Sequence, residues 1–336
     1  MPVPITSPAA LPAAHRLGAQ PRTVAVLRAL HLGDLLCTVP ALRALRAGLP
    51  DARISLIGLP WARAFVERFG AYIDEFVEFQ GFPGLPERAC QPRAVARFLA
   101  QMRERQFDLA IQLHGDGAVT NRLVSLLGAR LTAGFVGHGG WAPDDGLFLP
   151  YPTGLPEPRR HLELVRFLGL PLHGEELEFP LTPADRADAG RAAQRKDLGH
   201  EYAIVHPGSR AGDRRWSEEG FAGVADHLAD EGLAVVLTGT EEEAEITGGV
   251  ASRMRAKPVD LTGRTTLGAL GVLVAGARMV VCNDTGMSHV AAALRTPSVV
   301  VFSASDPLRW APRDRQRHRV VVARNGGAVD AVIAHV

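Results

Sequence analysis

The sequence has few cysteines, almost no lysine and no long apolar run. Its three cysteines, Cys37, Cys90 and Cys282, are far apart and show no spacing typical of a zinc site or a disulfide framework, so we expect a reducing compartment. Only two lysines occur, and arginine supplies nearly all of the positive charge. No stretch reaches the roughly 18 uncharged apolar residues that span a bilayer. Any membrane association is therefore expected to be peripheral.

The charge balance argues against a nucleic-acid partner. The chain has 37 Lys and Arg residues against 36 Asp and Glu residues, a formal net charge of +1. Binding to nucleic-acid phosphates requires a concentrated basic surface, which this balance does not predict. Residues 1–20 lack the basic start and unbroken apolar segment of a signal peptide. We expect them to form a disordered leader of a cytoplasmic protein.

The remaining sequence alternates between strand and helix patterns. Short β-branched runs and amphipathic helical segments follow one another along the 336 residues, which is typical of βαβ units around parallel sheets. The sequence predicts strands near residues 24–27, 54–57, 76–79, 109–113, 202–205, 234–237, 279–282 and 298–302, and helices at 35–46, 94–105, 218–230, 242–254, 267–275 and 288–294.

Two domains of this kind are expected. A stretch rich in proline and glutamate predicts a linker at 171–190, between an acceptor-binding domain at 21–170 and a nucleotide-sugar domain at 191–336. The last residues are expected to pack back on the N-terminal domain. The fold class is α/β, with two Rossmann-like doubly wound domains facing a central cleft, where ligands bind beyond the carboxyl ends of the strands.

The first candidate for chemistry is Asp34, in Leu32-Gly33-Asp34, which follows the opening strand and begins a helix. A carboxylate there lies at the carboxyl edge of the sheet, and the helix N-terminus favours its ionised form. It could accept a proton from an incoming hydroxyl. The alternative is an ordinary helix N-cap, a position that aspartate often fills. Pro40 predicts a kink or an early break in the same helix.

A second candidate follows the strand near residues 202–205 and reads His-Pro-Gly-Ser-Arg, continuing to Arg214, Arg215 and Trp216. Glycine and the hydroxyl of Ser209 allow backbone N–H groups to approach a phosphate, and Arg210 and Arg214 add donors for its oxygens. Pyrophosphate binding is one interpretation. A surface turn followed by solvated arginines is the other, and a contribution from Arg215 stays open.

The third candidate is the run Asn-Asp-Thr-Gly-Met-Ser-His at 283–289, between a strand and a helix. A strand, a glycine turn and a helix N-terminus rich in hydroxyls can hold a diphosphate, with Asp284 free to bind sugar hydroxyls. A structural turn needs only the glycine and one cap, so this density of polar residues favours a binding site formed by Asp284, Thr285, Gly286 and His289.

Two weaker features also follow predicted strands. His114 and Asp116, in His-Gly-Asp-Gly, could contact an acceptor, although a glycine-rich turn explains them equally well. Thr238 could contact the donor, but the acidic residues after it are also explained as the start of a helix. The sequence has no Walker loop, no G-x-G-x-x-G after the first strand and no serine nucleophile elbow, which disfavours NTPases, dehydrogenases and hydrolases.

Together these segments resemble glycosyltransferase family 9, which contains the ADP-heptose:lipopolysaccharide heptosyltransferases. The resemblance extends over residues 22–312, and the block at 283–289 is its most specific part. It implies a GT-B architecture and inverting, metal-independent transfer from ADP-heptose to a lipopolysaccharide or related glycan, without a cofactor. Asp34 matches the family base and Ser209 lies in the donor-phosphate loop. Asp284, Thr285, Gly286 and His289 match the donor-binding block.

The sequence departs from the better-known members of the family at two places. Arg214 stands where those proteins have a lysine, which keeps the positive charge but changes its geometry. The segment His114-Gly115-Asp116-Gly117 replaces a turn followed by a lysine near the acceptor site, which puts the usual acceptor in doubt. Another nucleotide sugar or acceptor, a nucleotide-sugar epimerase, and a non-catalytic sugar-binding module therefore stay open as alternatives. Any membrane contact would be at the inner face of the inner membrane.

Overall fold

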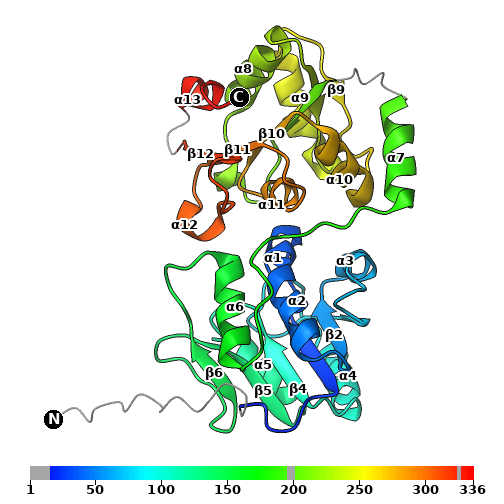
Figure 1. Ribbon diagram of the computed structural model, residues 1–336, viewed down its shortest axis with the longest axis vertical. Helices are drawn as coiled ribbons and strands as arrows, with labels where there is room; N and C mark the ends of the chain where they lie inside the picture. Colours follow the sequence, from blue (N-terminus) through cyan, green and yellow to red (C-terminus); the bar gives the residue numbers. More distant parts are fainter. Residues whose placement is uncertain (1–15, 195–200, 324–326) are drawn as a thin grey trace, which may run out of the picture. The chain divides into compact units, whose positions relative to one another are not determined.

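The chain folds into two compact units (Figure 1). The computed structural model describes residues 16–194, 201–323 and 327–336, so most of the expected leader lies outside the described residues. The first unit contains the described residues up to His31 together with Thr38–Glu175. The second contains Leu32–Cys37 and Glu176–Val336. The division after Glu175 falls within the stretch predicted as a linker, and the short segment 32–37 belongs to the second unit.

The first unit is built on a six-stranded parallel sheet. Its strands are β1 (Thr23–Leu27), β2 (Arg53–Gly58), β3 (Glu75–Glu78), β4 (Leu109–Gln112), β5 (Leu131–Val136) and β6 (Leu147–Pro150), in the order β3-β2-β1-β4-β5-β6. This is the strand order of a dinucleotide-binding fold, in which the chain reverses direction across the sheet between β1 and β4. The carboxyl ends of those two strands therefore form the switch point of the unit.

The helices of the first unit are α2 (Val39–Gly48), α3 (Ala62–Arg68), α4 (Pro92–Glu104), α5 (Thr120–Leu126) and α6 (Glu157–Phe167). The helix predicted at 35–46 is divided in two, into α1 (Leu32–Leu36) and α2, and Pro40 lies in the first turn of α2. Proline fits there because the first turn of a helix needs no N–H donor from that residue. The early break expected at Pro40 is confirmed.

The second unit repeats the same plan. Its strands are β7 (Tyr202–His206), β8 (Ala234–Leu237), β9 (Val259–Asp260), β10 (Met279–Asn283), β11 (Ser298–Phe302) and β12 (His318–Val322), in the order β12-β11-β10-β7-β8-β9. All of the pairings are parallel. The switch point here lies between β7 and β10, which are direct neighbours with Cys282 opposite His206.

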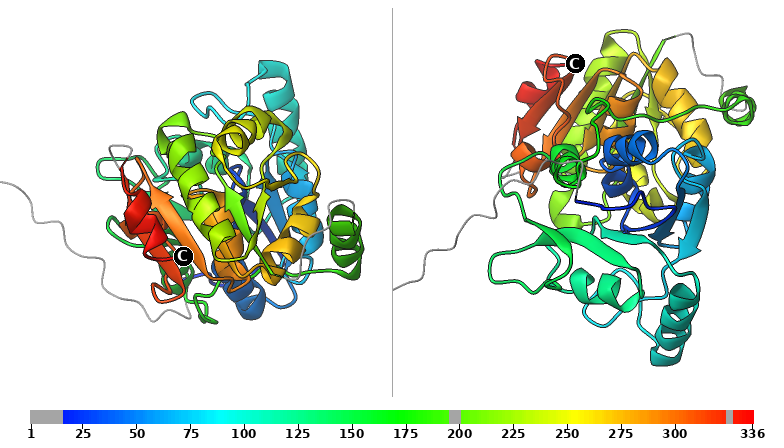
Figure 2. Two further views of the ribbon diagram at one scale, coloured as in Figure 1. Left: turned by 90° about the horizontal axis from the view of Figure 1, so that it is seen from above. Right: turned by 60° about the horizontal axis from the view of Figure 1, so that its bottom comes forward.

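The helices of the second unit come from three parts of the chain, near its start, in its second half and near its end. They are α1, α7 (Pro183–Gln194), α8 (Glu218–Asp230), α9 (Ala244–Arg253), α10 (Leu267–Gly276), α11 (Gly286–Ala293), α12 (Pro307–Trp310) and α13 (Val329–Ile333), with short 3₁₀ turns η2 (Gly212–Arg214) and η3 (Glu241–Glu243). Figure 2 shows α8 lying over this sheet, and Phe221 and Leu228 belong to the same buried cluster as Val281 and Val299 of the strands.

Two further segments form helices of the second unit. Residues 183–194, partly inside the predicted linker, form α7, which packs on α10. The last helix, α13, packs on α8, and Val332 is fully buried in the core of the second unit. Apolar residues at 329, 332 and 333 give the helix one buried face, which explains this packing. Among the described residues, no helix is long and apolar enough to cross a membrane.

Candidate active site

The two most specific sequence motifs meet at the switch point of the second unit. The segment from Pro207 to Arg210 follows β7, and the block from Asp284 to His289 follows β10. Since β7 and β10 are adjacent parallel strands, both motifs start from the same edge of the sheet. The two motifs therefore lie side by side, beyond the carboxyl ends of neighbouring strands.

Asn283 connects these two segments. Its side chain is fully buried at the end of β10. The amide Nδ2 donates to the carbonyl oxygen of Pro207 at 2.8 Å, and Oδ1 accepts from the backbone N–H of Trp216 at 2.9 Å. A buried amide that uses both of its groups on backbone partners fixes the loop geometry. Asn283 therefore serves to hold the site rather than to contact a ligand.

Asp284 is a buried carboxylate at the centre of the site, with 3% of its surface exposed. Its Oδ2 accepts a hydrogen bond from Ser305 Oγ at 2.5 Å and lies 3.8 Å from the guanidinium Nη1 of Arg214. Ser305 follows β11, the next strand along the sheet, and was not predicted, although its place beyond a strand end could have indicated it. A negative carboxylate repels phosphate but accepts hydrogen bonds from sugar hydroxyls. Arg214, which is partly exposed, can pair with a phosphate beside it.

The residues around Asp284 divide into ligand-facing and structural ones. Thr285 is the N-cap of α11, and its hydroxyl accepts from the N–H of Met287 at 3.3 Å, which leaves the hydroxyl hydrogen available to a ligand oxygen. Ser209 is buried, and its carbonyl accepts from Nε of Arg215 at 2.7 Å. Arg215 therefore holds the loop in place, whereas Arg210 is exposed at its tip.

Thr238, predicted to contact the donor, is engaged inside the protein. Its Oγ1 lies 3.1 Å from Nδ1 of His206, and the residue is 1% exposed. Burial lowers the pKa of His206 below its ordinary value, and the charge of Glu243 opposes this effect only in part. The carboxylate of Glu243 also accepts from the N–H of Thr240 at 2.8 Å, which is the helix-start role that the acidic run predicted.

Asp34 lies in the first turn of α1, a five-residue helix, and is half-buried. It is the third residue of that helix, so the N-cap alternative does not describe its position. Its neighbour Gly33 and the residue one turn further on, Cys37, both contact the imidazole of His289. The predicted base and the predicted donor loop therefore belong to one compact unit.

In the first unit, His114 lies in the loop after β4, two residues beyond the end of the strand, and is 6% exposed. Its Nδ1 accepts from the N–H of Ala29 at 3.3 Å, so Nε2 carries the hydrogen and donates to Glu87 Oε1 at 3.2 Å. Burial raises the pKa of Glu87, but the hydrogen bond from His114, a backbone hydrogen bond and the charges of His114 and His31 together lower it below its ordinary value. Asp116 is exposed, and its Oδ1 accepts from Ala118 N–H at 3.0 Å.

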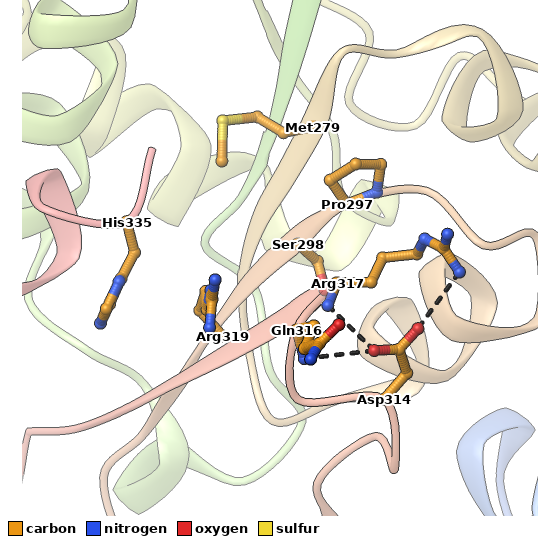
Figure 3. Close-up of a pocket in the computed structure, with 8 residues that line it drawn as sticks. All are labelled: Met279, Pro297, Ser298, Asp314, Gln316, Arg317, Arg319 and His335. Carbon is orange, nitrogen blue, oxygen red and sulfur yellow. Dashed lines mark hydrogen bonds and ion pairs between the residues drawn. The ribbon is translucent and has the colours of Figure 1, made fainter.

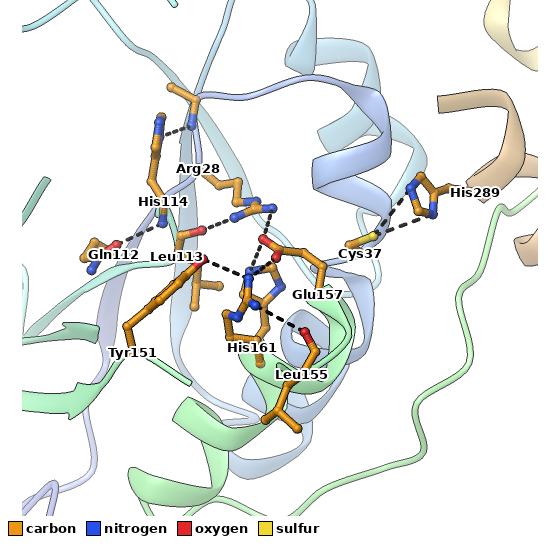
Figure 4. Close-up of polar contacts among 12 residues, drawn as sticks. Arg28, Cys37, Gln112, Leu113, His114, Tyr151, Leu155, Glu157, His161 and His289 are labelled. Carbon is orange, nitrogen blue, oxygen red and sulfur yellow. Dashed lines mark hydrogen bonds and ion pairs between the residues drawn. The ribbon is translucent and has the colours of Figure 1, made fainter. Parts of the chain in front are cut away.

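A buried ion network at the same edge was missed by sequence reasoning (Figure 4). Arg28 immediately follows β1 and is fully buried, and its guanidinium donates to the carbonyl of Leu113 and to Glu157 Oε1, the latter at 3.2 Å. Glu157 also accepts from Arg160 at 2.5 Å and lies 3.5 Å from His161 Nε2. The sequence feature that could have indicated this network is Arg28, a charged residue directly after an apolar strand. Its partner Glu157 is 129 residues away in the chain, so the pair could not be recognised from local sequence.

Away from these edges, a cavity of about 430 Å³ lies at the amino ends of β10, β11 and β12. Its lining includes Met279, Ser298, Arg319 and His335, as Figure 3 shows. Each strand contributes its first or second residue, so the cavity is at the sheet edge opposite to the motifs. Within the described ranges, no group of three or more His, Cys, Asp or Glu residues is arranged to hold a metal ion.

Two sheets of Rossmann order, with polar loops at a switch point, define an α/β protein of the nucleotide-binding kind. The model of glycosyltransferase family 9 (heptosyltransferase) matches residues 95–330, and the chain belongs to this family. It is therefore a glycosyltransferase, as the sequence motifs indicated.

Relatives agree with this assignment. The chain is 25% identical over 291 residues to lipopolysaccharide heptosyltransferase 3 of Escherichia coli, which covers 83% of each chain. Among solved structures, it is similar to a family 9 glycosyl transferase from Veillonella parvula, with a TM-score of 0.77 and 22% identity over 93% of this chain and 90% of that one. The structure of E. coli ADP-heptose lps heptosyltransferase II matches with a TM-score of 0.70 and 22% identity, over 91% of this chain and 92% of that one. The expected α/β class and GT-B fold are confirmed.

Proposed function

We propose that this glycosyltransferase moves a heptose from ADP-heptose to a lipopolysaccharide or related glycan acceptor, with inversion and without a metal ion. The observation that carries the proposal is the group formed by Asp284, Ser305 and Arg214 next to the N-terminus of α11. It combines an acceptor for sugar hydroxyls with donors for a diphosphate. The named E. coli relatives support heptose as the sugar and lipopolysaccharide as the acceptor.

In this proposal the donor diphosphate is bound by the exposed guanidinium of Arg210, by Arg214 and by the hydroxyl of Thr285. These groups stabilise the negative charge that grows on ADP as the bond from the anomeric carbon to the diphosphate oxygen breaks. The buried carboxylate of Asp284 accepts from hydroxyls of the sugar. Ser305 and Arg214 hold this carboxylate in place from within the second unit.

Asp34 is proposed as the general base. The acceptor hydroxyl attacks the anomeric carbon from the face opposite to the leaving group, forms the new glycosidic bond, and transfers its proton to the Asp34 carboxylate. Asp34 belongs to the same unit as the donor loop and lies one residue after Gly33, which contacts His289. This neighbourhood supports the assignment, together with the family resemblance.

The acceptor is proposed to bind the N-terminal domain at the carboxyl ends of β1 and β4. Asp116 is exposed there, and its hydrogen bond from the N–H of Ala118 uses Oδ1, so Oδ2 is the oxygen proposed to accept from the acceptor glycan. His114 uses both ring nitrogens within the protein, so its contribution would be to hold the loop rather than to bind the glycan directly. An acidic residue at this place favours a neutral or hydroxyl-rich acceptor over a phosphorylated one.

A donor screen tests the proposal. The thermal midpoint of unfolding is measured with ADP-, UDP- and GDP-sugars, because a ligand that binds the native state raises it. We expect a rise with ADP-heptose alone, followed by ADP release when truncated lipopolysaccharides are added. A response to a UDP- or GDP-sugar instead would refute the donor. Conversion of the donor without an acceptor would assign an epimerase, and binding without either reaction a sugar-binding module.

Asp34→Asn tests the base. The variant keeps the shape of the side chain but loses the basic carboxylate, so turnover is expected to fall by at least about 1,000-fold, within the range that general bases and their positioning contribute. Binding of ADP-heptose, followed by calorimetry, is expected to stay within about threefold. Substantial residual transfer by Asp34→Asn would eliminate Asp34 as the base.

A further inference from the structure

Gly33 of α1 and Cys37, the residue directly after α1, both approach the imidazole of His289. Sγ of Cys37 lies 3.6 Å from Nδ1 and 3.9 Å from Nε2 (Figure 4). A Cβ added to Gly33 would lie 2.8 Å from Cδ2 and 3.5 Å from Nε2 of the same ring. The N–H of Cys37 donates to the carbonyl of Gly33 at 3.0 Å, so the two residues are one turn apart, with Cys37 directly after the end of α1.

Glycine is required at position 33 because a side chain would collide with a neighbour, and not because of the backbone conformation. It does not adopt the left-handed region, in which glycine would be favoured. Glycine inside a helix costs about 1 kcal/mol relative to alanine, so another residue would suit α1 better if the position were open. Real Cβ atoms almost never come within 2.8 Å of another heavy atom. The absent side chain lets α1 approach the ring of His289.

A second close approach lies beside the first. A Cβ on Gly286, the first residue of α11, would lie 3.4 Å from Cβ of Leu32, so the two helices also meet through this pair. His289 is 4% exposed, and its ring faces Trp310 at a centroid distance of 6.3 Å with an interplanar angle of 64°. The imidazole is therefore enclosed, and its position is determined by its neighbours.

Helix α1 is too short to determine its own position. It has five residues and is separated from α2 by the break before Pro40. Helices below about 12 residues are marginal without tertiary packing, so the place of α1 depends on the surface it packs against. That surface is α11, whose N-cap is Thr285 and whose first residue is Gly286, both assigned to the proposed donor site.

We propose that Gly33 and Cys37 are positioning residues that dock α1 on His289 and thereby set where the Asp34 carboxylate lies relative to the donor loop. The proposal rests on the proposed function, since it gives these residues a role in the same transfer. His289 is then the contact that joins the base to the donor site, in addition to any contact with the donor. A displacement of about 1 Å can cost about 100-fold in rate, so this docking matters for turnover.

A double-mutant cycle between Gly33→Ala and His289→Ala tests the proposal. We measure kcat from ADP release with saturating ADP-heptose and the truncated lipopolysaccharide that gives the highest turnover with the unaltered chain. Gly33→Ala is expected to lower kcat at least tenfold, because the new methyl group collides with the ring. In the His289→Ala background the ring is absent, so the same substitution is expected to lower kcat less than twofold.

Matched variants separate the contact from general effects of the substitutions. Gly248→Ala makes the same change in α9, where an added Cβ has no neighbour within 4 Å, and is expected to leave kcat unchanged. Cys37→Ala is expected to lower kcat several-fold, whereas Cys90→Ala, at an exposed cysteine, has no effect. Cys37→Ser, which keeps a hydrogen-bonding group of similar size, is expected to restore part of the lost kcat.

Three outcomes would overturn the proposal. They are an equal loss from Gly33→Ala in both backgrounds, an unchanged kcat in Gly33→Ala, and an effect confined to the KM for the donor. If the unaltered chain transfers no heptose, the proposed function fails separately. The same cycle is then read from the thermal midpoint of unfolding, where coupling between residues 33 and 289 supports the docking contact and its absence overturns it.

Discussion

Asn283 gives the most direct test of how the donor loops are held. The substitution Asn283→Ala removes the amide that joins the carbonyl of Pro207 to the N–H of Trp216, across 2.8 Å and 2.9 Å. Both backbone groups are in the interior, and the asparagine itself has no exposed surface. The variant therefore leaves one buried donor and one buried acceptor without their partner. It also removes the hydrogen bonds that connect the loop after β7 to the end of β10.

The expected loss of stability follows from these two groups. Leaving a buried polar group unsatisfied costs about 1–3 kcal/mol, and entry of water into the vacated space relieves part of it, so we expect about 2–4 kcal/mol in total. For a unit of this size, each kcal/mol lowers the thermal midpoint by about 2–4 °C, which gives a decrease of roughly 4–16 °C. The freed loop is expected to weaken ADP binding at least tenfold.

The assay combines thermal unfolding with calorimetric titration of ADP at a temperature where all variants are folded. Asn121→Ala is the matched control, since Asn121 is also fully buried and its amide binds Gln112, Phe135 and Trp141 in the first unit. It is expected to lower stability similarly but to leave ADP affinity within twofold. If Asn283→Ala keeps both its thermal midpoint and its ADP affinity, the assigned role of Asn283 is wrong.

Two further predictions concern buried charge. Glu157→Gln leaves the buried guanidinium groups of Arg28 and Arg160 without their carboxylate, and is expected to lower the free energy of unfolding, measured in urea, by about 3–5 kcal/mol. The control Glu163→Gln, at a partly exposed surface pair with Arg166, is expected to lower it by less than about 1 kcal/mol. Equal effects of the two substitutions would contradict the buried network. Burial lowers the pKa of His318 from 6.5 to about 4, so the unfolded chain binds more protons between these values. The stability that His318 contributes is therefore complete above pH 6.5 and is lost as the pH falls towards 4. His318→Gln is expected to make unfolding midpoints less dependent on pH in that interval, and an unchanged dependence would refute the assignment.

The local pattern of the sequence predicted the strands that form the centre of each sheet. β1, β4, β7 and β10 are short apolar runs, and their positions were predicted to within one residue at each end. Four strands of the described residues were not predicted: the interior strand β5 and the edge strands β6, β9 and β12. β9 has only two residues, and β6 is half exposed and ends in proline. An edge strand is defined by its neighbour in the sheet more than by its own composition.

The sequence by itself also indicated which segments carry polar chemistry, because loops after parallel strands share one sheet edge whatever the details of packing. It could not show what each side chain is bonded to. Thr238 and Asn283 are similar polar residues at strand ends, yet one pairs with His206 and the other joins two backbone segments. Those partners are brought together only when the sheet and its crossovers have formed.

The clearest case is Asp34. Local sequence identified it as a polar residue at the start of a helix after the first strand, a position that by itself favours a helix cap over a base. The tertiary structure placed its short helix in the second unit, with Gly33 and Cys37 against His289, about 250 residues away in the chain. Contacts over such sequence separation depend on the closure of both sheets and on the space between helices, and no local periodicity encodes them.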